Sequence, residues 1–224
     1  MQAKKSIREE NLRKILLTKF LPNSSIDTNF NMWELNGSFY EKNFLETYHA
    51  LDGKEGTFPE TRYTVPLMEF GRFSVVFDEA IHFNRYRGKT LRSAFYDNIT
   101  SFPKVKYLSY CRKYEVECLK GGTARPEWTS REAERYFGEP QLPGDLGLSG
   151  APGWKLTALT DLATDMIARK RKIRLLRISI WDDLLLNQKL VKFKDMLVSP
   201  GKIETESILK YVERKVFGLY ADDF

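Results

Sequence analysis

An apolar segment of this chain runs directly into two carboxylates, and a histidine, an amide and two arginines follow. In chain order these polar residues are Asp78, Glu79, His82, Asn84, Arg85 and Arg87. Carboxylates at the end of a strand can hold a hard divalent cation, because the strand fixes their direction and its end leaves the ion open to water and substrate. Arginines one turn later could bind phosphate oxygens through paired hydrogen bonds. The pattern therefore predicts Mg or Mn at Asp78 and Glu79, in a solvent-filled notch with His82 beside them.

The same segment also fits a purely structural role. Asp78 or Glu79 could accept hydrogen bonds from the free amides of a helix that begins near Phe83, with both arginines solvated. On residue types alone, both interpretations stay open.

Positive charge is concentrated in two parts of the chain, whose formal net charge is +6. The segment between Ile81 and Tyr114 contains eight basic residues and one acid, Asp97. A second run, from Arg169 to Arg177, holds six cations and no acid. Clusters of this kind suit a polyanion, although solvated helix faces are an alternative. We expect nucleic acid, in particular DNA, to contact Asn84, Arg85, Arg87, Lys89, Arg92, Arg171 and Arg174, on the same side of the molecule as the notch.

The composition excludes several classes of protein. The 224 residues are 42% hydrophobic and 29% charged, values that fit neither a disordered nor a collagen-like chain. No uncharged apolar run approaches the roughly 18 residues of a membrane span, and the mixed-charge start is unlike a signal peptide. We therefore expect a cytoplasmic protein without membrane contact. Two cysteines, Cys111 and Cys118, and two histidines are too few for a structural zinc site, so buried free thiols are expected.

Periodicity predicts a mixed sheet flanked by helices, an α/β (α+β) fold. The predicted helices are 6–20, 39–51, 86–98, 105–120, 154–169 and 203–217, with a short helix near 129–137. The predicted strands are 63–70, 73–77 and 173–181. The common nucleotide-binding glycine motifs and the G-x-S-x-G elbow are absent from the sequence. The segment 121–153, rich in proline and glycine, is predicted to be an ordered insertion that Trp128, Tyr136 and Phe137 anchor against the helix starting at Trp154.

Three stretches of sequence resemble a known family. The run from Phe77 to Arg87, with Thr90-Leu91 and Phe95-Tyr96 after it, resembles an uncharacterised group of bacterial proteins with a D-E-x-x-H-F-N-R-Y-R box. That group is similar to the PD-(D/E)xK, or restriction-endonuclease-like, nuclease superfamily. The second match comprises Gly144-Asp145-Leu146, Gly150-Ala151-Pro152, Trp154-Lys155, Ala158 and Asp161. The third is the late strand Ile178-Ser179-Ile180-Trp181-Asp182.

The resemblance implies an α-β-β-β-α-β core and metal-dependent phosphodiester cleavage as the ancestral chemistry. It places Asp78 and Glu79 at the metal-facing strand end and His82 on the substrate side, and makes Lys155 a candidate for stabilising the pentacovalent phosphate. In the preceding strand, where the superfamily has its first acid, this chain offers Glu69. Two departures stand out: Val76 replaces the glutamate that normally opens the box, and Gly153 replaces an arginine before Trp-Lys.

These observations lead to three expected functions. The first is a metal-dependent nuclease or nuclease-like DNA-binding protein, in phage defence or mobile-element biology. The second is a catalytically inactive protein of the same fold that binds nucleic acid or a partner protein, and a homodimer is also compatible with it. The third is an unrelated structural protein. The expected organisation is a helical N-terminal extension over 1–60 and a restriction-endonuclease-like core over 61–224 with an insertion at 121–153.

Overall fold

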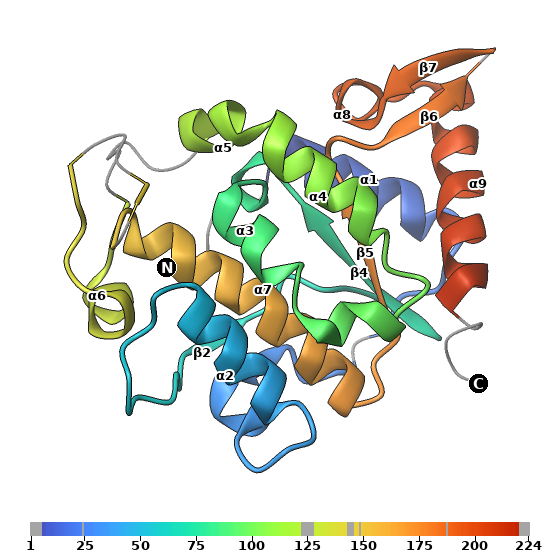
Figure 1. The fold of residues 1–224 in the computed structure, drawn as a ribbon. Helices are drawn as coiled ribbons and strands as arrows, with labels where there is room; N and C mark the ends of the chain where they lie inside the picture. Colours follow the sequence, from blue (N-terminus) through green and yellow to red (C-terminus); the bar gives the residue numbers. More distant parts are fainter. Residues whose placement is uncertain are drawn as a thin grey trace. The chain divides into compact units, whose positions relative to one another are not determined.

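The computed structural model describes residues 6–23, 25–121, 128–142, 146–147, 149–186 and 188–219 (Figure 1). The chain divides into two compact units, each built from segments that are distant in sequence. The first unit comprises Met1–Asp27, Pro66–Glu79 and Ile173–Phe224. The second comprises Thr28–Val65 and Ala80–Lys172. Helices and short strands occur in both, so the predicted mixed α and β architecture is confirmed at this level.

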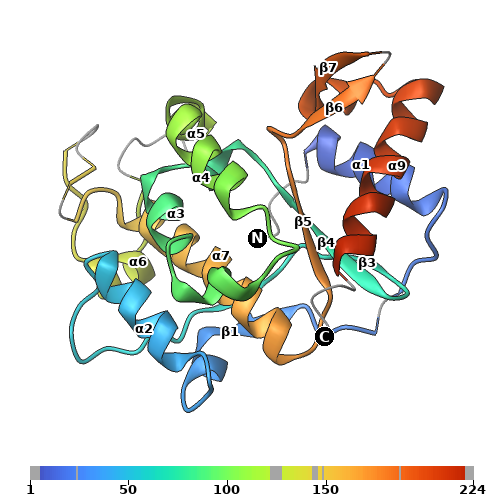
Figure 2. The same cartoon turned by 45° about the vertical axis from the view of Figure 1, so that its right-hand side comes forward.

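A mixed three-stranded sheet forms the centre of the first unit (Figure 2). Its strands, in spatial order, are β3 (Met68–Phe70), β4 (Phe73–Asp78) and β5 (Leu175–Ser179). β4 pairs antiparallel with β3 and parallel with β5, with Asp78 opposite Ser179. Every residue of β4 is buried, as expected for a strand that pairs in parallel and is covered on both faces. The predicted hairpin and the predicted late strand are thus confirmed.

Helices and a second hairpin complete the first unit. α1 (Ile7–Leu17) starts at Ser6, whose hydroxyl accepts a hydrogen bond from the Glu9 amide at 3.1 Å. α1 contacts α9 (Lys202–Leu219), and α9 also contacts β5 and β6. The short strands β6 (Asp183–Leu186) and β7 (Lys189–Lys192) pair antiparallel and are followed by α8 (Phe193–Met196). The sequence did not predict this hairpin, because only Leu184 of its residues is buried and the apolar pattern is correspondingly weak.

The second unit is built around α7 (Pro152–Lys170), which is buried along most of its length. A helix buried on most sides needs neighbours all round, and α2 (Glu41–Ala50), α3 (Arg85–Thr90) and α6 (Arg131–Phe137) contact it. The other helices of this unit are the 3-10 helices η1 (Met32–Leu35), η2 (Ala80–His82) and η3 (Ala94–Asn98), and α4 (Lys104–Lys113) and α5 (Glu115–Gly121). The strands β1 (Asn29–Asn31) and β2 (Arg62–Thr64) pair antiparallel.

Three predicted elements are wrong in their extent. The single strand predicted over 63–70 is two strands, β2 and β3, because Pro66 in the gap lacks the N–H that a continuous ladder needs. The helix predicted over 105–120 is two helices, α4 and α5, interrupted at Tyr114. The helix predicted over 86–98 ends at Thr90 and is followed by η3.

The described part of the 121–153 segment is anchored as predicted. Trp128 packs edge-on against Trp154, with ring centroids 4.2 Å apart, and its carbonyl accepts a hydrogen bond from the Gly153 amide at 2.9 Å. Tyr136 and Phe137 are buried. A side chain at position 153 would collide with the Trp128 carbonyl, which explains why this chain has glycine there. The residues Gly144 and Asp145 of the second sequence match lie outside the described residues.

Both cysteines are free and buried, as predicted. Burial raises the pKa of each thiol to about 12. Across the described residues, none of the helices has the length and apolar composition needed to span a bilayer.

Candidate functional site

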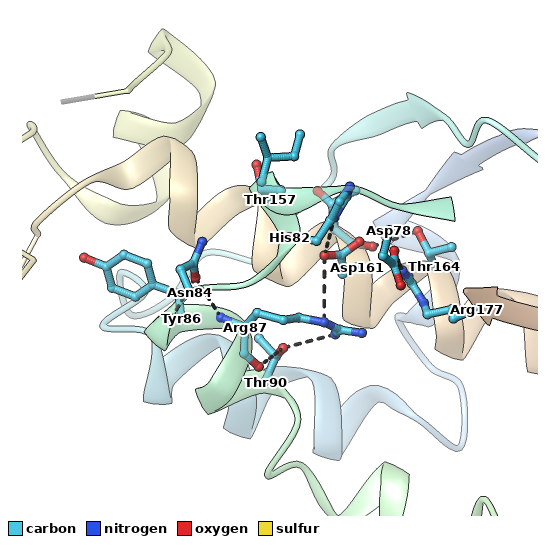
Figure 3. Close-up of polar contacts among 12 residues, drawn as sticks. Asp78, His82, Asn84, Tyr86, Arg87, Thr90, Thr157, Asp161, Thr164 and Arg177 are labelled. Atoms are coloured by element: carbon cyan, nitrogen blue, oxygen red, sulfur yellow. Dashed lines mark hydrogen bonds and ion pairs between the residues drawn. The ribbon is translucent and has the colours of Figure 1, made fainter. Parts of the chain in front are cut away.

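Within the second unit, the box residues Ala80–His82 form η2, and Asn84 then starts α3. The Asn84 side-chain oxygen accepts hydrogen bonds from the backbone amides of Tyr86 and Arg87, both at 3.0 Å (Figure 3). Asn84 is therefore the N-cap, which satisfies amides that lack partners in the first helical turn. The interpretation in which Asp78 or Glu79 caps this helix is wrong. The prediction that Asn84 contacts nucleic acid remains a prediction, and Asn84 is buried.

Arg87 lies at the centre of a buried cluster between α3 and α7. Its side chain is 2% exposed. The guanidinium donates to the Tyr96 hydroxyl at 3.0 Å and to Asp165 Oδ2 at 3.2 Å, and its Nε lies 3.8 Å from Asp161 Oδ2. Asp161 and Asp165 are four residues apart on α7, so they lie on one face of that helix. One buried cation thus compensates two carboxylates whose mutual repulsion would otherwise destabilise this face.

His82 is oriented by the same cluster. Its Nδ1 lies 2.9 Å from Asp161 Oδ2, and the His82 side chain is 22% exposed while that of Asp161 is 8% exposed (Figure 3). With the proton on Nδ1, the ring donates to the carboxylate and its Nε2 becomes a proton acceptor. A partly exposed imidazole held by a buried carboxylate can act as a general acid or base. We define His82, Arg87, Asp161 and Asp165 as the histidine–carboxylate cluster.

Lys155 occupies a separate position at the start of α7. The side chain is buried, and its Nζ lies 2.9 Å from Asp52 Oδ2 and over the ring of Tyr86 at 5.5 Å. Burial lowers the pKa of the Lys155 amine, and the Asp52 carboxylate partly opposes that effect. Lys155 precedes Asp161 by six residues, which on an ideal helix is about 9 Å along the axis and about 120° around it. Lys155 contacts Asp52 and Tyr86 at the start of α7, and its catalytic role remains a prediction.

The predicted acids of the first unit are held by three different partners. Asp78 is 1% exposed, and its Oδ1 lies 2.5 Å from Nη1 of the buried Arg177 on β5. Glu79 accepts a hydrogen bond from the Ser6 hydroxyl at the start of α1. Glu69 accepts from the Ile26 amide at 3.2 Å and pairs with Ser74. Ser74 precedes Asp78 by four strand residues, or about 13 Å, so Glu69 and Asp78 are far apart along the hairpin.

These contacts correct one prediction about the acids. Asp78 does not face a solvent-filled notch, because it is buried in an ion pair that compensates its charge. Asp78 and Glu79 therefore do not fit, as a pair, the two-carboxylate centre that the sequence predicted. Mg or Mn binding at these residues remains a prediction.

The predicted nucleic-acid-binding cations differ in exposure. Arg85 makes a double hydrogen bond to Glu115, at 2.8 Å through both Nε and Nη2, and this cation lowers the pKa of the Glu115 carboxyl. Arg171 makes a similar pair with Glu34 at 2.9 and 2.7 Å. Lys89 donates to the Ala50 carbonyl at 3.1 Å and is half-buried. Arg92 and Arg174 are exposed. Arg87, in contrast, contacts carboxylates and is buried from solvent.

Sequence reasoning missed the part of the site that α7 contributes. Asp161 and Tyr96 belong to the resemblance, which gives neither a role, and Asp165 is in none of the predicted sites. A usable signal was present: two acids at helical spacing, Asp161 and Asp165, stand among the apolar residues of the predicted helix. Burying two carboxylates requires a compensating cation, and the box offered one.

Taken together, the fold and the site define an α+β protein with a half-exposed histidine held by a buried arginine–carboxylate cluster. The chain belongs to a family of unknown function (DUF7255), whose profile matches residues 46–199. The matched segment includes every member of the histidine–carboxylate cluster. The search of curated proteins and the search of solved structures each found no match to this chain.

Proposed function

We propose that this protein is a nuclease of the restriction-endonuclease-like class, acting on DNA, in which His82 transfers the proton. The observation that carries the proposal is the 2.9 Å contact between His82 Nδ1 and Asp161 Oδ2, combined with the partial exposure of the imidazole. The resemblance of the box to PD-(D/E)xK nucleases and the positive charge of residues 81–114 support the choice of substrate.

The cluster suggests how each residue contributes. His82 Nε2 accepts a proton from a water molecule, the resulting hydroxide forms a bond to phosphorus, and the bond from phosphorus to the leaving oxygen breaks. The imidazolium then returns its proton to that oxygen. Asp161 holds the ring orientation and stabilises the imidazolium, while Arg87 pairs with Asp161 and fixes it in place. Mg or Mn, where bound, would supply charge stabilisation at the phosphate.

A second function has an observation in its favour. Val76 stands where the box normally begins with glutamate, and Asp78 is engaged by Arg177. An inactive protein of this fold that binds nucleic acid or a partner protein is consistent with both facts. It differs from the first function in requiring no proton transfer by His82.

A plasmid-nicking assay with Mg²⁺ or Mn²⁺ separates the two. We expect His82→Gln and Asp161→Asn to slow nicking by about 10²–10⁴-fold, the usual contribution of a general base, without weakening DNA binding. His49→Gln is the matched control, because His49 is the other histidine of the chain and is exposed on α2. Nicking that survives His82→Gln would refute the assigned role. A wild-type protein that binds DNA but never nicks it under either metal would favour the inactive alternative.

A further inference from the structure

The cations between Ile81 and Tyr114 fall into two groups in the structure. Four of them are engaged by carboxylates: Arg85 by Glu115, Arg87 by Asp161 and Asp165, Lys89 by Asp52, and Lys104 by Asp97. Their charge is largely compensated within the unit, so they contribute little to the field outside it. The other four, Arg92, Lys106, Arg112 and Lys113, are exposed, and the last three of these lie on α4.

α4 has one buried face and one cationic face. Tyr107, Tyr110 and Cys111 are buried. The exposed positions are Val105, Lys106, Ser109, Arg112 and Lys113. Their spacing of three, four and seven residues places them on one side of the helix. No acid occurs within α4, so nothing on the helix itself offsets the charge. We define Lys106, Arg112 and Lys113 as the α4 cationic face.

Two of these cations lie against aromatic rings, which restricts their side chains. Lys106 Nζ lies 5.8 Å from the centroid of the Tyr110 ring, and Lys113 Nζ lies 5.2 Å from that of Tyr114. Both rings are buried, so packing restricts the movement of the rings themselves. Holding a long cationic side chain before a ligand arrives reduces the entropy lost on binding. In the part of the chain that the structure describes, Arg112 and Lys113 form no ion pair.

We propose that the α4 cationic face binds the phosphate backbone of DNA. The identity of the ligand rests on the proposed function, whereas the surface rests on the exposure and charge of α4. Lys106 and Lys113 are separated by about 10 Å along the helix, far enough apart to reach different phosphates. An anionic membrane fits less well, because a membrane-binding helix inserts its apolar face, and the apolar face of α4 is buried in the unit.

The structure therefore moves the expected DNA contact from the box to α4. Arg85 and Arg87 were predicted to bind phosphate, but their guanidinium groups meet carboxylates of the same unit. The box then orients the histidine–carboxylate cluster, and α4 supplies the affinity for the polyanion. Contacts of this kind would be independent of base sequence, because they read only phosphate charge.

The test is DNA binding by the 224-residue chain, measured by fluorescence anisotropy with a labelled 20-bp duplex over a salt series. In the variant with Lys106→Gln, Arg112→Gln and Lys113→Gln, we expect the Kd near 0.1 M salt to rise by on the order of 10²-fold. The slope of log Kd against log salt should fall by about 2.7, since each phosphate contact contributes about 0.9. The matched control removes three exposed cations of the same unit outside α4, through Lys42→Gln, Arg62→Gln and Arg131→Gln.

Each outcome either supports or overturns the proposal. Equal losses in the triple variant and its matched control would show a general charge effect and overturn it. A lower melting temperature with unchanged DNA affinity would show that Arg112 and Lys113 serve only the C-terminal end of α4, and would also overturn it. Binding to vesicles of phosphatidylserine and phosphatidylcholine, with none to DNA, would point to a membrane instead. If the triple variant loses DNA binding and His82→Gln leaves the nicking rate unchanged, the α4 binding surface is supported and only the catalytic role of His82 is refuted.

Discussion

Removing Arg87 should destabilise the protein more than removing any exposed arginine. The guanidinium is 2% exposed and has Thr90, Tyr96, Asp161 and Asp165 within 3.8 Å. In Arg87→Met, a side chain of similar length keeps the packing but leaves two buried carboxylates without their cation. Breaking a buried ion pair from one side costs about 3–5 kcal/mol of unfolding free energy. For a chain of this size, that corresponds to a fall of about 6–20 °C in melting temperature.

Arg85→Met provides a matched control two residues away. Arg85 pairs with Glu115, and its side chain is 52% exposed, so water can solvate the remaining carboxylate. Exposed pairs contribute about 1 kcal/mol or less. The difference between the two variants therefore isolates the effect of burial, since both remove one arginine from α3.

Urea denaturation gives the unfolding free energy of both variants, and calorimetry gives their melting temperatures. Adding Asp165→Asn to Arg87→Met should restore part of the lost stability, because it removes one of the uncompensated charges. An Arg87→Met variant within about 1 kcal/mol of the parent would refute the reasoning. It would mean that water reaches the histidine–carboxylate cluster and that Arg87 does not hold Asp161 in place.

Two further predictions concern buried groups of the second unit. Burial lowers the pKa of Lys155, so the unfolded chain binds more protons than the folded chain between the lowered pKa and 10.5. The unfolding free energy should therefore rise with pH in that window. Urea denaturation at several pH values should show that Lys155→Met abolishes this rise. Cys111 and Cys118 have pKa values of about 12, so they should resist iodoacetamide at pH 8 in the folded protein and react with it in 6 M guanidinium. Mass spectrometry follows the modification, and rapid modification of the native protein would contradict their burial.

Local patterns were sufficient for several elements. The helix from Trp154 and the last helix were predicted from apolar spacing, and the structure places them at Pro152–Lys170 and Lys202–Leu219. The hairpin of β3 and β4 followed from branched and aromatic residues around Gly71. Periodicity works in these cases because each element has one continuous apolar pattern. It failed where one pattern spans two elements, at Pro66, which lacks an N–H for the strand ladder, and at Tyr114, where the helix is interrupted.

The candidate site was only half visible in the sequence. The box identified His82 and Arg87 as residues of interest, because clustered polar groups after an apolar strand are unusual. The sequence could not show that Asn84 caps a helix, that Arg85 pairs with Glu115, or that Arg87 is buried between two aspartates. The roles of Arg85 and Arg87 depend on carboxylates that are 30 to 78 positions away in the chain, whereas the Asn84 cap acts on amides two and three positions away.

The sequence by itself determined the residue types, the positive charge of the middle of the chain and the presence of helices and strands, since these depend on composition and short-range spacing. Tertiary structure alone decided which charges are compensated. Asp78 pairs with Arg177 across β4 and β5, and Arg87 meets Asp161 and Asp165 on α7, while Lys106, Arg112 and Lys113 on α4 remain exposed. The physical reason is that a buried charge needs an opposite charge within a few ångströms, and the fold brings such partners together from distant segments.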